Sequence, residues 1–137
     1  MKRLLILVSC VVLLLCACSP KLVNGSSSNS FPENHPDYAV VYLYRTGGYV
    51  KTAYDVHLNN DVVYRSKNKT KTAIKVDKPG KYQIWGKTES SETLTLDIEM
   101  GQDYYVKTFV HMGAAIWRPS LEIVSSTEGK KDWNSIK

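Results

Sequence analysis

A series of short β-rich runs fills most of the chain after its first 37 residues and constrains the fold more than any other feature. The clearest run is Glu92–Glu99, in which Leu94, Leu96 and Ile98 alternate with polar residues. A period of two places alternate side chains on opposite faces of a strand, so one face is expected to be buried and the other hydrated. The runs themselves show no convincing helical period, so the main domain is predicted to be all-β.

The other runs follow the same pattern and are separated by turn residues. They are Ala39–Arg45, Thr52–Asn59, Val62–Arg65, Thr70–Asp77, Lys81–Thr88, Tyr104–His111 and Trp117–Ser125. Asn59-Asn60-Asp61 tolerates left-handed backbone and predicts a hairpin, and Lys78-Pro79-Gly80 suits a reverse turn. Side chains expected to face the core include Tyr54, Val56, Leu58, Ile74, Val76, Tyr82 and Ile84. Seven to eight short strands predict a single antiparallel β-sandwich, with a small barrel as the alternative.

The first 17 residues have the features of a secretory signal peptide. Met1-Lys2-Arg3 is basic, and the apolar run Leu4–Leu15 is shorter than the roughly 20 residues that a membrane span needs. The segment Leu15-Cys16-Ala17-Cys18 resembles a bacterial lipobox, in which a diacylglyceryl group is attached to the cysteine thiol and the chain is cut before it. The small Ala17 suits that cleavage, so Cys18 is the predicted lipidation site.

All three cysteines lie in or at the end of this segment, so a mature chain keeps only Cys18 and forms no internal disulfide. Residues 18–37 are rich in Ser, Asn and Pro and are expected to be the lipidated cysteine and a flexible tether. As a flexible coil, the 18 residues from Ser19 to Pro36 have a root-mean-square reach of about 20–25 Å. Ser19 is not aspartate, which by resemblance to known sorting favours the outer membrane in a Gram-negative cell.

Residues 38–126 are then the sandwich domain and 127–137 a C-terminal tail. The tail is expected to form a helical turn that packs Trp133 and Ile136 on the domain. The formal charge of +5 includes Lys2 and Arg3, so the mature chain carries +3. A charge this small, on an exported protein, argues against nucleic acid as a partner.

Several motifs resemble a known family of bacterial lipoproteins, the domain-of-unknown-function family 2846. They are VVYLYR, YDVHLNNDVVYRS, VDKPGKYQIWGKT and LDIEMGQDYYVK, which together span roughly residues 38–124. The resemblance implies an immunoglobulin-like or prealbumin-like sandwich and no known activity. The turn Asn59-Asn60 stands where the first hairpin of the family usually has a glycine-rich turn, so the type of this turn is left open.

The sequence contains no motif that indicates an enzyme, a metal site or a cofactor. His35, His57 and His111 do not follow a metal-ligand spacing, and no strand-to-helix nucleophile elbow occurs. Asp97 and Glu99 lie two residues apart on one strand face, as a glycosidase carboxylate pair might, and Glu89 and Glu92 form another pair. Polar faces of strands commonly carry such pairs, so a hydrolase is the weakest hypothesis and the protein is predicted not to be an enzyme.

Two groups of residues are candidates for binding. Arg65, Lys67, Lys69 and Lys71 recur at every second position, so an extended backbone would align them as a basic strip for an anionic ligand or surface. Lysines that protect a strand edge from pairing explain the same pattern. Trp85 and Trp117 are candidates for contact with a sugar or a partner, and the alternative for Trp85 is a place in the core if the register is shifted by one residue.

The sequence thus predicts a lipid-anchored protein of the cell envelope, in which the sandwich is a non-catalytic interaction module. Its expected partners are the membrane, through the anchor, and an envelope protein or glycan. The alternative is a lipoprotein that binds a small carbohydrate or an anion through the strip between Arg65 and Lys71.

Overall fold

The computed structural model of the chain describes residues 23–25 and 31–137. The predicted signal peptide and Cys18 lie outside these residues. The described elements, in chain order, are β1 (Val23–Gly25), β2 (Ala39–Arg45), β3 (Tyr54–Leu58), β4 (Asp61–Ser66), β5 (Thr70–Val76), β6 (Gly80–Lys87), β7 (Ser91–Ile98), β8 (Asp103–Met112), β9 (Trp117–Val124) and α1 (Ser126–Ser135). Within the described part of the chain, no helix is long and apolar enough to cross a membrane.

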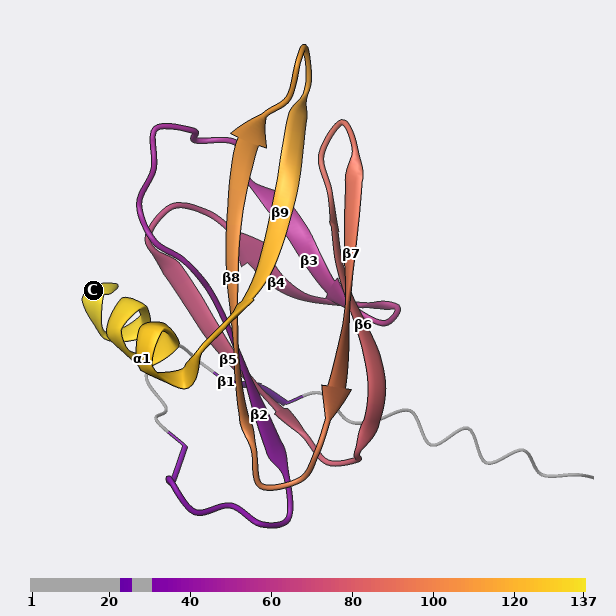
Figure 1. Cartoon of the computed structure of the whole chain (residues 1–137), viewed down its shortest axis with the longest axis vertical. Helices are drawn as coiled ribbons and strands as arrows, with labels where there is room; N and C mark the ends of the chain where they lie inside the picture. The colour runs from indigo at the N-terminus through magenta and orange to yellow at the C-terminus, as the bar shows by residue number, and fades with distance from the viewer. Residues whose placement is uncertain (1–22, 26–30) are drawn as a thin grey trace, which may run out of the picture.

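The strands form two sheets that pack face to face (Figure 1). Sheet A has the order β1-β5-β2-β8-β9 and sheet B the order β4-β3-β6-β7, so the predicted all-β sandwich is confirmed. An immunoglobulin-like sandwich keeps its first two strands in one sheet. Here β2 and β3, the first two strands of the domain, lie in different sheets.

The prediction of a wholly antiparallel sandwich is wrong at one pair of strands. β2 lies between β5 and β8, antiparallel to β5 and parallel to β8. Alternation along a strand reports which side chains are buried, but it does not report the direction of the neighbouring strand. This parallel pair occupies the centre of sheet A.

The core between the sheets follows the predicted alternation. Every inward side chain predicted from β3, β5 and β6 is buried, and Leu96 and Ile98 of β7 join them. Asn59, with φ of 53°, begins the predicted hairpin turn between β3 and β4. The sequence therefore assigned the inner faces of both sheets correctly.

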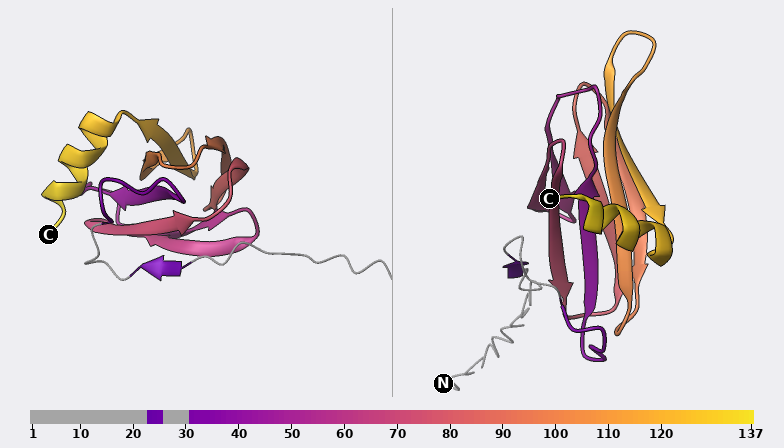
Figure 2. Two further views of the ribbon diagram at one scale, coloured as in Figure 1. Left: turned by 90° about the horizontal axis from the view of Figure 1, so that it is seen from below. Right: turned by 90° about the vertical axis from the view of Figure 1, so that its left-hand side faces the viewer.

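The outer face of sheet A is also buried. All seven residues of β2 are buried, and its outward side chains belong to a second apolar cluster. Helix α1 lies over this face of sheet A (Figure 2). Ser125 caps α1, because its side chain accepts a hydrogen bond from the N–H of Glu128. Trp133 and Ile136 pack on this cluster, as the sequence predicts for the C-terminal tail.

Part of the predicted tether is folded onto the domain. Phe31 packs against the second cluster, and His35 is 4% exposed and bonded to the domain. The three residues of β1 pair with β5 at the edge of sheet A. The expectation of a flexible tether over residues 18–37 is thus wrong at 23–25 and from residue 31 on, because an aromatic and a buried histidine find partners that local composition does not reveal.

Candidate functional site: a cleft on the outer face of sheet A

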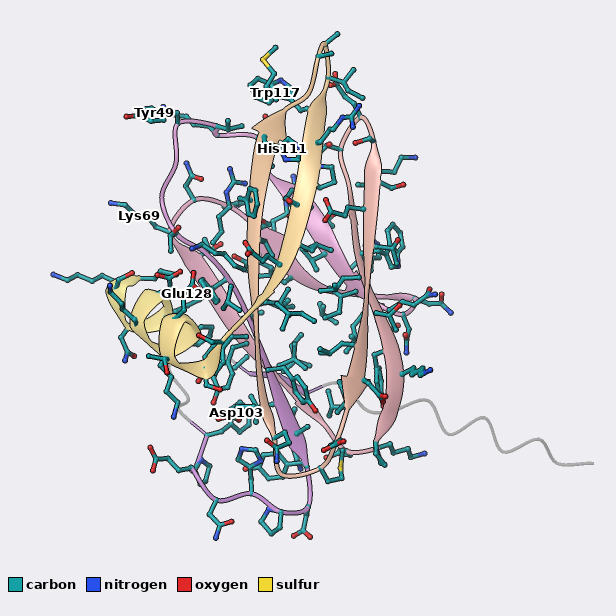
Figure 3. The ribbon with its side chains drawn as sticks, viewed as in Figure 1. Tyr49, Lys69, Asp103, His111, Trp117 and Glu128 are labelled. Carbon is teal, nitrogen blue, oxygen red and sulfur yellow. The ribbon has the colours of Figure 1, made fainter. Side chains whose placement is uncertain are left out.

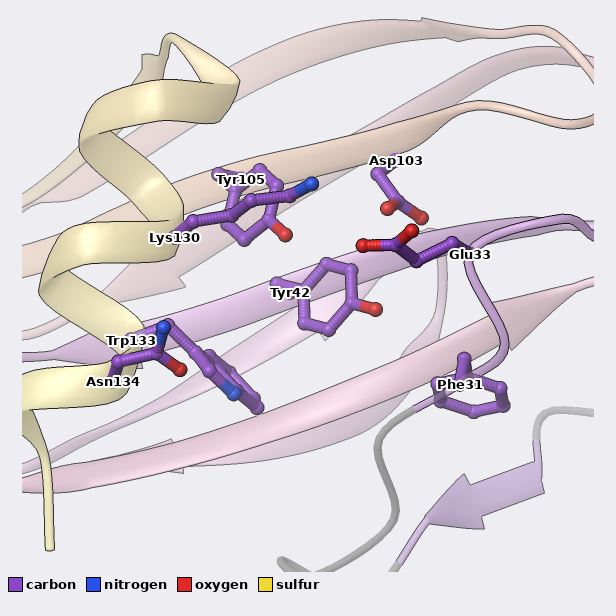
Figure 4. Close-up of a pocket in the computed structure, with 8 residues that line it drawn as sticks. All are labelled: Phe31, Glu33, Tyr42, Asp103, Tyr105, Lys130, Trp133 and Asn134. Atoms are coloured by element: carbon purple, nitrogen blue, oxygen red, sulfur yellow. The ribbon is translucent and has the colours of Figure 1, made fainter.

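A cleft lies on the outer face of sheet A, in the gap between the two segments that cover this face. Helix α1 forms one wall, the segment that begins at Phe31 forms the other, and sheet A forms the floor (Figure 4). Its volume is about 230 Å³. The lining residues are Phe31, Glu33, Tyr42, Asp103, Tyr105, Lys130, Trp133 and Asn134.

Two tyrosines from the parallel pair of strands form the floor. Tyr42 and Tyr105 are in register, and their rings stack with centroids 4.6 Å apart and planes 6° apart. The Trp133 ring meets Tyr42 nearly at right angles, with centroids 5.0 Å apart. Because the two strands run in the same direction, both phenol hydroxyls point toward the end of the cleft at Asp103 (Figure 4).

These hydroxyls are free to contact a ligand as neutral donors and acceptors. Burial, with a further contribution from the charge of Asp103, raises the pKa of Tyr105 to about 12 and raises the pKa of Tyr42 further. Both phenols are therefore protonated at neutral pH. Among the described residues, neither hydroxyl makes a hydrogen bond within the protein.

A clamp at His35 holds the Phe31–Tyr38 wall on the sheet. The His35 Nδ1 lies 2.8 Å from the carbonyl oxygen of Tyr38, and its Nε2 lies 2.9 Å from Oδ1 of Asp103. The Tyr38 ring stacks on the imidazole at 4.7 Å, and the N–H of Gly101 donates to the Tyr38 carbonyl. Burial lowers the pKa of His35, but the two hydrogen bonds and the Asp103 charge outweigh it and leave that pKa raised.

The helical wall is fixed by polar and steric complementarity. Lys107 of β8 forms ion pairs with Asp132 at 2.8 Å and with Glu128 at 3.5 Å, and the Tyr44 hydroxyl donates to Asp132. Gly129 faces Tyr105 so closely that a Cβ atom there would lie 2.2 Å from Cγ of the tyrosine. The helix therefore approaches the sheet at the one position where it has no side chain.

The chemistry of the cleft suits binding of a small polar molecule. Carboxylates of Glu33 and Asp103, the ammonium of Lys130 and the two phenols converge at one end (Figure 4), while Phe31 and Trp133 supply apolar walls. The lining holds two carboxylates and one ammonium, and one of the carboxylates, Asp103, is bonded to His35 behind the cleft. A ligand would meet donors and acceptors in close alternation.

The residues of the predicted basic strip do not form one extended face. Arg65 belongs to β4 and pairs with Asp55 at 2.8 Å, whereas Lys67 and Lys69 lie in or beside the turn before β5. Lys69 has φ of 57°, which interrupts the extended backbone that the alignment required. Lys71 instead caps the end of α1, because its ammonium donates to the carbonyl oxygens of Trp133 and Ile136.

The predicted tryptophans lie away from the cleft. Trp85 is on the outer face of sheet B, where its ring stacks on His57 at 3.7 Å and its Nε1 donates to the Asn59 carbonyl. Trp117 is partly buried against the main core, at the end of the molecule opposite Asp103 (Figure 3). Neither tryptophan shares a site with the basic residues.

The carboxylate pairs and histidines do not form a catalytic arrangement in the described part of the chain. Asp97 on β7 and Glu99 just after it are exposed, whereas Glu89 and Glu92 accept hydrogen bonds from backbone N–H groups of β9. His57 and His111 lie in different sheets. No group of three His, Cys, Asp or Glu residues in residues 31–137 is close enough to hold a metal ion.

The sequence contained two signals of this cleft. The run Ala39–Arg45 is apolar on both faces, which requires a cover on the outer face as well as the inner one. Ser125 and Glu128 have the spacing of a capping box, which announces a helix just after β9. Comparisons of the chain with protein-family models, with curated proteins and with solved structures find no match.

Proposed function

We propose that this protein is a lipid-anchored protein of the bacterial cell envelope whose sandwich binds one sugar unit of an envelope glycan in the outer-face cleft. Binding is non-catalytic. The observation that carries the proposal is the convergence of two phenol hydroxyls, which have no hydrogen-bond partner among residues 31–137, with carboxylate, ammonium and amide groups in a hollow walled by Phe31 and Trp133.

Three properties of the cleft favour a sugar over other ligands. Its volume of about 230 Å³ is below the roughly 300–1,000 Å³ of sites for drug-sized molecules, so it fits one small ring. It carries groups of both charges, and Asp103 is already bonded to His35, which favours a neutral ligand over an ion. Its polar groups include both donors and acceptors, which match the hydroxyls of a sugar, while the aromatic walls match the C–H faces.

Substitution of single hydroxyls tests the binding site. The phenols of Tyr42 and Tyr105 each contribute one hydrogen bond, so Tyr42→Phe and Tyr105→Phe should each weaken binding about tenfold without unfolding the domain. The probe is a panel of neutral oligosaccharides of glucose, galactose and N-acetylglucosamine, titrated by calorimetry. Tyr49→Phe is the matched control, because Tyr49 is fully exposed and does not line the cleft.

The titration separates the proposal from its competitors. Wild-type binding to a saccharide that both cleft variants weaken supports it. Failure of the whole panel to bind, or binding that both variants leave intact, contradicts it. Turnover of any saccharide would contradict the non-catalytic part.

The anchor is tested separately. Cys18 supplies the thiol for the acyl chains, and stable attachment needs two or more chains, each CH₂ contributing about 0.8 kcal/mol. A Cys18→Ser protein should therefore leave the membrane fraction, and Cys16→Ser is the control. A Cys18→Ser protein that matures normally and stays with membranes would overturn the envelope anchor.

A second candidate function, binding of an anion, rests on a groove at the end of α1. Lys69, Lys71 and Lys137 line it, and its lining contains no acidic side chain. Phosphate binding that weakens steeply with salt, and that the Lys69→Gln and Lys137→Gln double variant abolishes, would support this function. The matched control is Lys78→Gln with Lys81→Gln, at exposed positions outside the groove.

A further inference from the structure

One titratable group lies directly behind the cleft, and its contacts select its charged form. Both ring nitrogens of His35 face oxygens that only accept hydrogen bonds: the carbonyl of Tyr38 and the carboxylate of Asp103. A neutral imidazole carries one N–H and can satisfy only one of these oxygens. The imidazolium form carries two N–H groups and satisfies both.

The charged surroundings of His35 are few. The carboxylate in contact with His35 is that of Asp103 on β8. The Tyr38 ring stacks on the imidazole, and the ammonium of Lys75 on β5 lies 4.7 Å from the centroid of that ring. Lys75 is itself paired with Asp77 at 3.1 Å. Glu33 and Asp37 belong to the same segment as His35. The turn before β8 contacts this segment through the backbone N–H of Gly101. The contact with Asp103 therefore dominates.

We propose that His35 is a positioning residue of the cleft: its imidazolium form holds the Phe31–Tyr38 wall in place, so ligand binding depends on pH. This inference rests on the cleft being the binding site. Deprotonation leaves one N–H for two acceptors, so one ring nitrogen turns a lone pair toward an acceptor oxygen, and the wall that carries Phe31 and Glu33 loses part of its attachment. The cleft is then complete at a pH below the raised pKa of His35 and incomplete above it.

The wall can be followed without any ligand. Backbone hydrogen exchange over residues 33–38, expressed as protection relative to intrinsic rates, reports its attachment between about pH 5.5 and 9. In the wild type, we expect protection and affinity for the best saccharide of the panel each to fall about tenfold over this range. The His35→Gln variant should have low protection that does not change with pH.

Two further variants define the titrating group. Asp103→Asn keeps an acceptor for Nε2 but removes the charge, so the loss of protection should move to lower pH. His111→Gln is the matched control, because His111 is exposed on β8 outside the cleft, and it should behave as the wild type.

The outcomes separate this proposal from the one on which it rests. Protection in the wild type that stays constant with pH, or a transition that survives in His35→Gln, overturns the role of His35 whatever the saccharides do. A transition as expected in a protein that binds no saccharide at any pH supports the role of His35 and overturns the proposed ligand.

Discussion

The two outer faces of the sandwich differ in almost every respect. On sheet A, the outward side chains of β2 are buried under α1 and the Phe31–Tyr38 segment, and the gap between these covers is the cleft. On sheet B, β6 and β7 alternate between inward apolar and outward polar residues, and Trp85 is only partly covered. The apolar outer face of sheet A has to be covered, and the segments that cover it also form the walls of a cleft. The candidate site therefore lies on sheet A.

The covers come from opposite ends of the domain sequence. Because the helix and the N-terminal segment are each short, neither closes the face alone, and their polar residues meet across the floor of Tyr42 and Tyr105. The outward side chains of β6 and β7 in sheet B are exposed or half-exposed instead. We therefore expect the same kind of substitution to destabilise the domain more on the outer face of sheet A than on that of sheet B.

The same substitution on both faces should give the largest contrast. Trp133 contacts Tyr42, Tyr44 and Lys71, so Trp133→Ala should lower the free energy of unfolding by about 3 kcal/mol. Trp85→Ala removes the stacking contact with His57 and should lower the free energy of unfolding by about 1 kcal/mol. Urea unfolding measures both. Equal losses would mean that the helix does not serve as a cover.

A methyl group at Gly129 tests how tightly that cover fits. Helix propensity alone would make Gly129→Ala stabilising by up to about 1 kcal/mol. The close approach of Tyr105 reverses the sign, and we expect a net loss of about 2 kcal/mol. Lys131→Ala, on the exposed side of α1, is the control. A more stable Gly129→Ala protein would contradict the docked position of the helix.

The other cover should respond to pH. Because hydrogen bonds and Asp103 raise the pKa of His35 above 6.5, the folded state binds this proton more tightly than the unfolded state. The stabilisation is complete below pH 6.5 and is lost as the pH rises through the raised pKa of His35. Thermal unfolding of wild type and His35→Gln should therefore converge in alkaline solution. A constant difference between them would contradict this sign.

The smallest effect concerns the ion pairs beneath α1. Lys107 is partly exposed, so Lys107→Gln should cost about 1 kcal/mol or less in the free energy of unfolding. The loss should shrink in high salt, because screening already weakens the pair. Lys87→Gln, an exposed change on sheet B, should have no measurable effect.

Much of the fold could be predicted from local pattern. Alternation located the inward residues of β3, β6 and β7, and the asparagines at 59 and 60 marked a hairpin turn. The parallel pairing of β2 with β8 could not be predicted in this way, because strand partners are chosen over long sequence separations. The position of Lys69 shows the converse: a regular spacing of lysines indicates one face only if the backbone stays extended.

The candidate site could be predicted only in part. Trp133 and Ile136 were expected to pack on the domain, but the helix that carries them was expected as a single turn. Phe31 and His35 could not be assigned, because a Ser-, Asn- and Pro-rich composition obscures the two residues that find partners on the sheet. Tyr42 and Tyr105 lie more than sixty positions apart, and only the strand order makes them neighbours.

The short strand β1 has a consequence for the distance between the domain and a bilayer. Only five peptide steps separate Cys18 from Val23, and an extended chain covers at most about 18 Å in that number of residues. With acyl chains on Cys18 and β1 paired to β5, the β1 edge of sheet A would be held close to the lipid headgroups. The sandwich would then meet the glycans nearest the membrane first.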